Sequence, residues 1–195
     1  MVRAIIVRQG NKYDECYTKA LKRQLKEQGI DALVLGDGPD ADVKLRHGYE
    51  GWWAKLELFS PDLKAYRPFL YLDLDSIVLG AIPDIDSEKF MMCEEWNPTC
   101  HKRNVCQSSM MWIPKEVDYI WESIDAQTIK TKGGDQAWLC QFNEEFLTEK
   151  YPYLVGSYKF GDMEEPKHNV VTFHGRPKMK DAGGWAEMVW KAYST

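Results

Sequence analysis

Two aspartates one residue apart are the clearest candidates for chemistry in this sequence of 195 residues. Asp73 and Asp75 lie within FLYLDLDSIVLG, residues 69 to 80, a stretch typical of a buried β-strand. Side chains alternate along a strand, so we expect both carboxylates on one side and Leu74 on the other. Two like charges in a small space repel each other unless one takes up a proton or a cation lies between them. The pattern therefore indicates chemistry rather than packing.

Three interpretations compete for this Asp-Leu-Asp motif. In the plainest one, the pair ends a strand and contacts only water, which suits a short and common pattern. In the second, the pair is the nucleophile and acid of a haloacid-dehalogenase-type metal-dependent phosphatase, although we find no convincing acidic pair after a later strand, as that family requires. In the third, the carboxylates hold Mg²⁺ or Mn²⁺, which neutralises the diphosphate of a sugar nucleotide and stabilises the departing nucleoside diphosphate.

The elements that must position the aspartates alternate between strand and helix over the first 80 residues. The sequence predicts a strand at 3–8, a helix at 14–28, a strand at 32–35, a helix at 50–59 and then the strand that carries the motif. Asp14 is expected to cap the first helix and Gly29 to end it. Such a pattern indicates an α/β fold, whose ligands collect beyond the carboxyl ends of the strands, where Asp73 and Asp75 fall.

Beyond residue 80 the pattern of strands and helices is mixed. We expect strands at 89–93, 107–113 and 169–173, and helices at 116–124, 135–143 and 185–193. No repeat, low-complexity tract or linker divides the chain. The sequence therefore predicts a single domain over residues 1–195.

Composition narrows the choice of partners and compartment. The net charge of −5 disfavours binding to nucleic acid, which depends on many basic side chains. No apolar run is long enough to predict a membrane span. Eight tryptophans leave open a third function, a non-catalytic carbohydrate-binding module that stacks them on sugars. The oligomeric state is not indicated.

The five cysteines form an odd set without a C-x-x-C pair. This pattern favours reduced thiols and a cytoplasmic location. A zinc site at Cys93, Cys100, His101 and Cys106 is conceivable, but these residues lie farther apart than the ligands of structural zinc sites usually do. We therefore expect the cysteines to carry no chemistry.

Four segments around the aspartates appear in an order that resembles the GT-A glycosyltransferases, most closely their family 8, the glycogenin and galactosyltransferase type. The segments are GWWAKLELF with Lys55; CQSSMMWI with Gln107, Ser108 and Ser109; GGDQAWL with Asp135 and Gln136; and FHGRPK with His174 and Lys178. The resemblance runs through most of the chain. It implies a GT-A, Rossmann-like α/β fold in which helices flank a mixed sheet.

The resemblance also implies an activity, a cofactor and partners. The expected reaction is metal-dependent transfer of a sugar from a nucleoside diphosphate to an acceptor hydroxyl, with retention of configuration. UDP is preferred because the resembled family uses it, and the acceptor is a glycan, a small molecule or a protein. Mn²⁺ or Mg²⁺ would be held by Asp73, Asp75 and His174.

The remaining roles complete the expected site. Asp135 and Gln136 are the catalytic candidates, Asp135 being the base if the enzyme inverts configuration. Tyr13 is available to stack on the base. Residues expected to bind the donor are Gln9, Gly10, Asn11, Tyr13, Lys55, Asp73, Leu74, Asp75, Ser108, Ser109, His174, Gly175 and Lys178. The sequence departs from the family pattern at Ala137, where an acidic residue is expected, and in the spacing after His174, which leaves acceptor and stereochemistry open.

Overall fold

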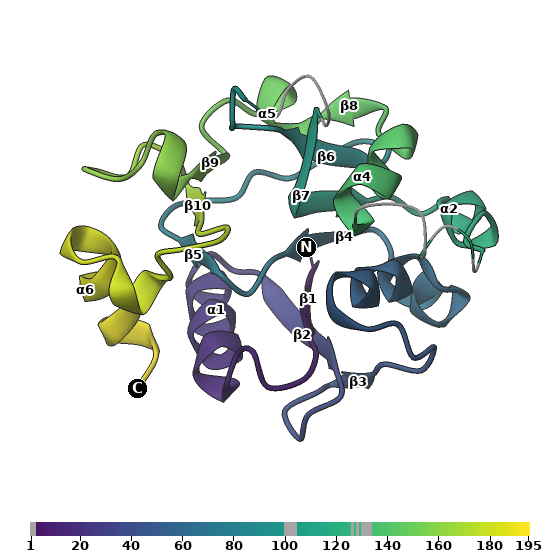
Figure 1. The fold of residues 1–195 in the computed structure, drawn as a ribbon, viewed down its shortest axis with the longest axis horizontal. Coiled ribbons are helices and arrows are strands. Elements are labelled where there is room, and N and C mark those ends of the chain that lie inside the picture. The colour runs from purple at the N-terminus through teal and green to yellow at the C-terminus, as the bar shows by residue number, and fades with distance from the viewer. Residues whose placement is uncertain (1–2, 100–104, 126, 128, 130–133) are drawn as a thin grey trace.

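The protein is described by a computed structural model that covers residues 3–99, 105–125, 127, 129 and 134–195 (Figure 1). Within these residues a seven-stranded mixed sheet has the order β3-β2-β1-β4-β7-β6-β8, and a three-stranded sheet has the order β5-β10-β9. The strands are β1 Arg3–Arg8, β2 Asp31–Gly36, β3 Val43–Lys44, β4 Phe69–Leu72, β5 Ser76–Val78, β6 Met91–Glu94, β7 Cys106–Ile113, β8 Glu145–Phe146, β9 Val155–Ser157 and β10 Val170–Thr172.

The helices flank the larger sheet on both faces. The α-helices are α1 Glu15–Glu27, α2 Asp118–Glu122, α4 Asp135–Leu139, α5 Leu147–Lys150 and α6 Gly184–Tyr193, and the 3₁₀ helices are η1 Gly51–Phe59, η2 Pro61–Tyr66, η3 Cys140–Phe142, η4 Tyr158–Phe160 and η5 Met179–Asp181. Leu70 and Leu72 of β4 pack in one core with residues of α1 and α6, which lie side by side (Figure 1). Phe69 and Tyr71 alternate with them and pack in a second core with residues of η1, η2, α2 and α4. The predicted fold class is confirmed.

The first part of the chain folds as predicted. Strand β1 pairs in parallel with β2 on one side and with β4 on the other. The Asp14 carboxylate accepts the Cys16 N–H at 3.1 Å and caps α1, and Gly29 follows the helix with a φ of 74°. The parallel strands place the ends of β1 and β4 at one edge of the sheet, which is where the Asp-Leu-Asp motif begins.

The prediction of one strand through residues 69 to 80 is wrong. Strand β4 ends at Leu72 and pairs with β1 and β7, whereas β5 begins at Ser76 and pairs with β10 in the second sheet. The chain changes sheets in between, so Asp73 and Asp75 lie in a turn rather than in a continuous strand. Strand alternation therefore does not set the directions of the two carboxylates, and neighbouring segments decide what each one contacts.

The helix predicted at 50–59 is a 3₁₀ helix, η1. The segment buries Ala54 and then four consecutive residues from Leu56 to Phe59, which cannot share one face of an α-helix. In the second half, the expected strands appear as β6, β7 and β10, and the expected helices as α2, α4 with η3, and α6. Strands β3, β8 and β9 were not predicted, because two or three residues show no periodicity. No helix among the described residues is long and apolar enough to cross a membrane.

Candidate active site

A cleft of about 900 Å³ opens beyond the carboxyl ends of β1 and β4 and contains most of the predicted site residues. It brings together Gln9, Tyr13, Lys55, Asp73, Leu74, Asp75, Gln107, Ser108, Ser109, Asp135, Gln136, His174, Gly175 and Lys178. Gly10 and Asn11 belong to the described residues but do not line the cleft, and the Gly10 N–H instead donates to the Asp37 carboxylate at 2.9 Å. Residues separated by more than 160 positions in sequence thus meet in one site.

The first carboxylate of the motif belongs to a largely buried network, which we call the Asp73 cluster (Tyr71, Asp73, Lys55, Ser108 and Asp135). Asp73 accepts a hydrogen bond from the Tyr71 hydroxyl, and its Oδ1 lies 2.9 Å from Lys55 Nζ. Lys55 Nζ also lies 3.4 Å from Asp135 Oδ2 and donates to Ser108 Oγ at 3.1 Å. Ser108 Oγ in turn donates to Asp135 at 3.0 Å. One ammonium group therefore joins two carboxylates from different elements.

Burial dominates the electrostatics of the Asp73 cluster. Burial raises the pKa of Asp73 above its ordinary value; Lys55 opposes this shift and Asp75 adds to it. Burial alone would lower the pKa of Lys55, but Asp135 and Asp73 raise it above the ordinary value of lysine. The pKa of Tyr71 is also raised, first by burial and then by Asp73, so its hydroxyl remains a donor. Lys55 therefore stays charged between the two carboxylates.

The second carboxylate has its own partners, which we call the Asp75 cluster (Tyr13, Asp75 and Lys178). Asp75 Oδ2 accepts from the Tyr13 hydroxyl at 2.9 Å and from Lys178 Nζ. Lys178 Nζ also donates to the Phe173 carbonyl at 2.9 Å and lies 5.6 Å from the centre of the Tyr13 ring. Burial, followed by Asp75, raises the pKa of Tyr13. Each aspartate of the motif thus has one lysine and one tyrosine.

His174 lines the cleft, but its present contacts are not with the aspartates. Its Nε2 lies 2.7 Å from Ser157 Oγ, and its ring stacks with those of Trp96 and Phe160, with centroids 6.0 and 5.7 Å away. Burial, followed by Lys159, lowers the pKa of His174, which favours the neutral imidazole.

The donor set expected for a divalent cation is chemically suitable. Carboxylate oxygens and a neutral imidazole are suitable ligands for Mn²⁺, and carboxylates for Mg²⁺. Among the described residues, however, no three such side chains stand close enough together to hold a metal ion. Asp75 contacts Lys178, and His174 contacts Ser157. Asp75 and His174 can therefore bind a cation together with Asp73 once Asp75 releases Lys178 and His174 releases Ser157.

Two residues at the end of β1 position the cleft wall. Gln9 Oε1 accepts the Gly51 N–H at 2.7 Å, and Gln9 Nε2 donates to the Tyr49 carbonyl at 2.5 Å. Gly51 has a φ of 61°, which favours glycine, and it begins η1, the helix that carries Lys55. Arg8 Nε donates to the Tyr13 carbonyl at 3.1 Å. Gln9 therefore fixes the start of the segment that supplies Lys55, while Arg8 holds the loop of Tyr13.

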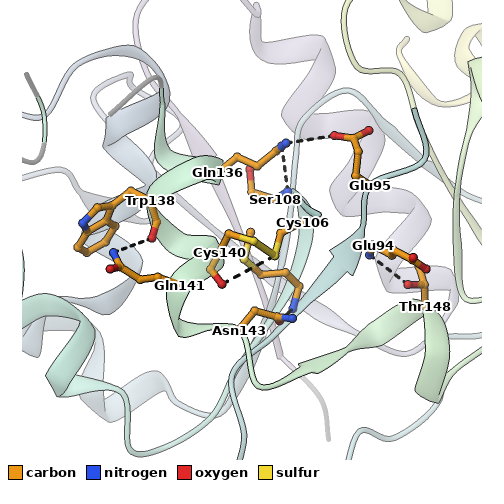
Figure 2. The surroundings of a disulfide bond; sticks show 11 residues. Glu94, Glu95, Cys106, Ser108, Gln136, Trp138, Cys140, Gln141, Asn143 and Thr148 are labelled. Atoms are coloured by element: carbon orange, nitrogen blue, oxygen red, sulfur yellow. Dashed lines mark hydrogen bonds between the residues drawn. A yellow bond between two sulfur atoms is a disulfide. The ribbon is translucent and has the colours of Figure 1, made fainter. Parts of the chain in front are cut away.

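A disulfide bond joins two elements of the site and corrects the prediction of reduced cysteines. Cys106, at the start of β7, is bonded to Cys140, which follows α4, with a Cα–Cα distance of 5.5 Å (Figure 2). The cysteine count hid this pair because 34 positions separate the partners. The cysteine pattern therefore no longer argues for a cytoplasmic location.

The other cysteines bear on the thiol and zinc predictions. Cys16 and Cys93 are free, whereas Cys100 and His101 of the zinc hypothesis lie outside the described residues. The sulfur of Cys106 forms the disulfide with Cys140 and is therefore not a free thiolate for zinc.

The disulfide adjoins hydrogen bonds that connect β7 with α4. Gln136 Oε1 accepts the Ser108 N–H at 3.3 Å, and Gln136 Nε2 donates to Glu95 at 3.3 Å (Figure 2). Gln136 thereby contacts the strand that supplies Ser108, next to Asp135 of the Asp73 cluster. The covalent bond and these hydrogen bonds together fix where α4 begins relative to β7.

Sequence reasoning missed several lining residues, among them Trp52, Tyr71 and Lys180. Tyr71 belongs to an apolar strand, so the sequence marks it as a core residue. Trp52 is 64% exposed and stands at the start of η1. Arg176 lines the cleft too, and its place within the FHGRPK segment marks it, whereas no pattern marks Lys180.

Comparisons with known proteins give structural matches only. No protein-family profile matches the sequence, and no curated protein matches it significantly. Among solved structures, the glycosyltransferase GlyE of Streptococcus pneumoniae TIGR4 aligns over 99% of this chain and 60% of its own, with a TM-score of 0.68 and 17% identity. The galactosyltransferase LgtC in complex with donor and acceptor sugar analogues aligns over 100% of this chain and 97% of its own, with a TM-score of 0.68 and 12% identity.

A third structure has the same fold. A glycosyltransferase involved in glycosylation of the major capsid of PBCV-1 aligns over 99% of this chain and 98% of its own, with a TM-score of 0.63 and 11% identity. The chain spans 60% of the length of GlyE. The chain therefore has the GT-A fold of these glycosyltransferases.

Proposed function

We propose that this protein is a glycosyltransferase that moves a sugar from a nucleoside diphosphate, UDP being the first candidate, to an acceptor hydroxyl. The observation that carries the proposal is the cleft itself, where the paired aspartates, Lys55 and Lys178 meet beyond the ends of β1 and β4. A diphosphate needs cationic partners, and lysine ammonium groups supply them. The three solved structures compared above are glycosyltransferases, which supports the same conclusion.

The donor would lie across the cleft with its parts on different segments. Tyr13, whose ring is partly buried at the end of the β1 loop, is suited to stack on the base. Lys178 is suited to bind the diphosphate, and Ser108 and Ser109 to bind the sugar. Lys55 is already bonded to Asp73 and Asp135, so its contribution is to hold both carboxylates in place.

A divalent cation would be held by Asp73, Asp75 and His174. When bound, such a cation neutralises charge on the diphosphate and on the departing nucleoside diphosphate. The chain's own part is to place both carboxylates at one edge of the cleft, through the turn between β4 and β5, and to keep His174 neutral.

Asp135 and Gln136, which line the cleft, are the catalytic candidates of this proposal. Asp135 is 5% exposed and accepts from Ser108 while Lys55 compensates its charge, which suits a role in positioning or stabilising charge. We therefore assign Asp135 a positioning role and propose retention of configuration, the stereochemistry of the family that the sequence resembles, rather than inversion with Asp135 as base.

The fold favours this proposal over the two alternatives. The solved structures compared above are glycosyltransferases rather than phosphatases. A carbohydrate-binding module would not need two lysines paired with the two aspartates of the motif.

A panel of nucleoside diphosphates in a thermal-shift assay tests the proposal, because a ligand that binds only the folded state raises the melting temperature. We expect UDP to stabilise the protein in Mn²⁺ and to do so far less in EDTA. Asp75→Asn should remove the difference, whereas Asp84→Asn, outside the cleft, should keep it. Stabilisation by sugars alone, or release of phosphate from an aryl phosphate ester, would favour the alternatives and count against the proposal.

A further inference from the structure

We propose that Lys178 is a built-in counter-ion of Asp75 that competes with the divalent cation for this carboxylate. The inference rests on the proposed function for the identity of the cation, but it concerns side chains that the structure places in contact. In this account Lys178 occupies the position of the cation in the empty enzyme and moves to the diphosphate when the donor binds.

One oxygen of the Asp75 carboxylate already accepts two hydrogen bonds. Asp75 Oδ2 accepts from the Tyr13 hydroxyl at 2.9 Å and also from Lys178 Nζ. An ammonium group and a divalent cation repel each other, and they cannot occupy the same side of one carboxylate. A cation that binds this side of Asp75 must therefore displace Lys178. The displacement reduces the affinity of the empty enzyme for the cation.

Among the described residues, the ammonium group of Lys178 is paired with fewer carboxylates than that of Lys55, so Lys178 can exchange its partner more easily. Lys178 lies in the segment between β10 and η5, and its side chain is held by one carboxylate and the Phe173 carbonyl. Lys55 lies within η1 and contacts two carboxylates and a hydroxyl. Lysine carries its charge on a flexible four-carbon stem, so Lys178 can reach a new partner without movement of the backbone.

The diphosphate offers Lys178 that new partner. The cleft is also lined by Gly175, Arg176 and Lys180. The segment that carries Lys178 therefore already faces the space in which the donor would bind. Once Lys178 binds phosphate oxygens, Asp75 is free for the cation. Binding of cation and nucleotide is then coupled, and by linkage each strengthens the binding of the other.

Calorimetric titration of Mn²⁺ without nucleotide tests the competition. The variants are Lys178→Met and, as a control that removes the same charge, Lys191→Met on the exposed side of α6, where Lys191 pairs with Glu187. We expect Lys178→Met to bind Mn²⁺ about 3- to 10-fold more tightly than wild type, the range for releasing one partly buried ion pair. Lys191→Met should match wild type. Equal or weaker binding by Lys178→Met would overturn the proposal.

The titration of UDP into the Mn²⁺-loaded variant separates this inference from the proposed function. We expect Lys178→Met to lose about 10-fold in UDP affinity, because it loses a charge-assisted contact to phosphate. A merely structural lysine would weaken both titrations together, which would count against the competition. If wild type binds Mn²⁺ but never UDP, the proposed function fails, while the gain in Mn²⁺ affinity still supports the role of Lys178.

A measurement on the wild-type protein covers the case in which the variant does not fold. Limited acetylation followed by peptide mass spectrometry reports which lysines are accessible. We expect saturating Mn²⁺ to raise the acetylation of Lys178, because displacement from Asp75 exposes its ammonium group, while Lys55 stays protected. Unchanged labelling of Lys178 at saturating Mn²⁺ would show that the lysine keeps its place and would overturn the proposal.

Discussion

The Asp73 and Asp75 clusters are built from the same residue types but differ in what anchors their lysines. Lys55 extends from η1, whose start is fixed by Gln9, and it joins Asp73 to Asp135. Lys178 extends from the segment after β10 and, within the part of the chain that the structure describes, pairs with one carboxylate. The same pair of charges therefore forms a permanent junction in one cluster and an exchangeable contact in the other.

The difference indicates how one short motif can serve both architecture and ligand binding. Because the chain changes sheets between Asp73 and Asp75, each carboxylate faces a different group of segments. Asp73 faces the elements of the larger sheet, which are tied together by β7 and α4. Asp75 faces the C-terminal segment that arrives from the smaller sheet. Variants that disturb one cluster more than the other therefore test this comparison.

The largest effect is expected from Lys55→Met. This change leaves Asp73 and Asp135 without their shared cation, and an uncompensated buried charge costs about 3 to 5 kcal/mol. Denaturant unfolding measures the loss, with Lys64→Met as control, because the exposed Lys64 pairs with Asp118 at the surface. We expect little change in the control. If Lys55→Met unfolded at the same denaturant concentration as the control, the Asp73 cluster would not be a structural junction.

A smaller effect is expected from removing the disulfide. The double variant Cys106→Ser, Cys140→Ser should lose about 2 to 4 kcal/mol, because the unfolded chain gains freedom. It should also weaken the positioning of Asp135 against Ser108, and hence the Asp73 cluster more than the Asp75 cluster. Cys93→Ser provides a matched control at a buried free cysteine. Thiol titration of the unfolded protein counts the bond directly, and four or five free thiols per chain without reductant would contradict it.

The smallest effect concerns His174, which precedes Lys178 on the same segment. Its folded pKa is lowered by burial and by Lys159, whereas the unfolded pKa is about 6.5. Below that pH the unfolded chain binds more protons, so stability present above about pH 6.5 is lost as pH falls through the folded pKa. Stability curves from pH 7.5 to 5 should be flatter for His174→Gln than for wild type. Parallel curves would mean that His174 is not held neutral.

The sequence predicted the strands and helices correctly where a regular hydrophobic pattern extends over a whole element. The strand 3–8, the capped helix 14–28 and the strand 107–113 follow from regular patterns, and the structure confirms them. The same reasoning failed at residues 69 to 80, because one apolar run serves two sheets and nothing in the run marks the break. The helix type at 50–59 was also missed, since helix type depends on which neighbours the segment packs against.

Most of the expected site could be assembled from motif order, but its contacts could not. Asp73, Asp75 and Lys55 line one cleft as expected. The partnership of Lys178 with Asp75 depends on how β10 pairs with β5, which brings together segments about 100 positions apart. The disulfide depends likewise on the packing of α4 against β7. Pairings of this kind arise from tertiary structure and leave no local signal.

In the proposed function, the cleft holds a nucleoside diphosphate and a divalent cation at the two aspartates. Diffraction from crystals grown with UDP and Mn²⁺, measured at the manganese absorption edge, would locate both ligands. We expect one anomalous peak in contact with Asp73 and Asp75, with Lys178 moved from Asp75 to the diphosphate. A map without a peak at the aspartates, in which UDP is bound while Lys178 remains on Asp75, would contradict this expectation.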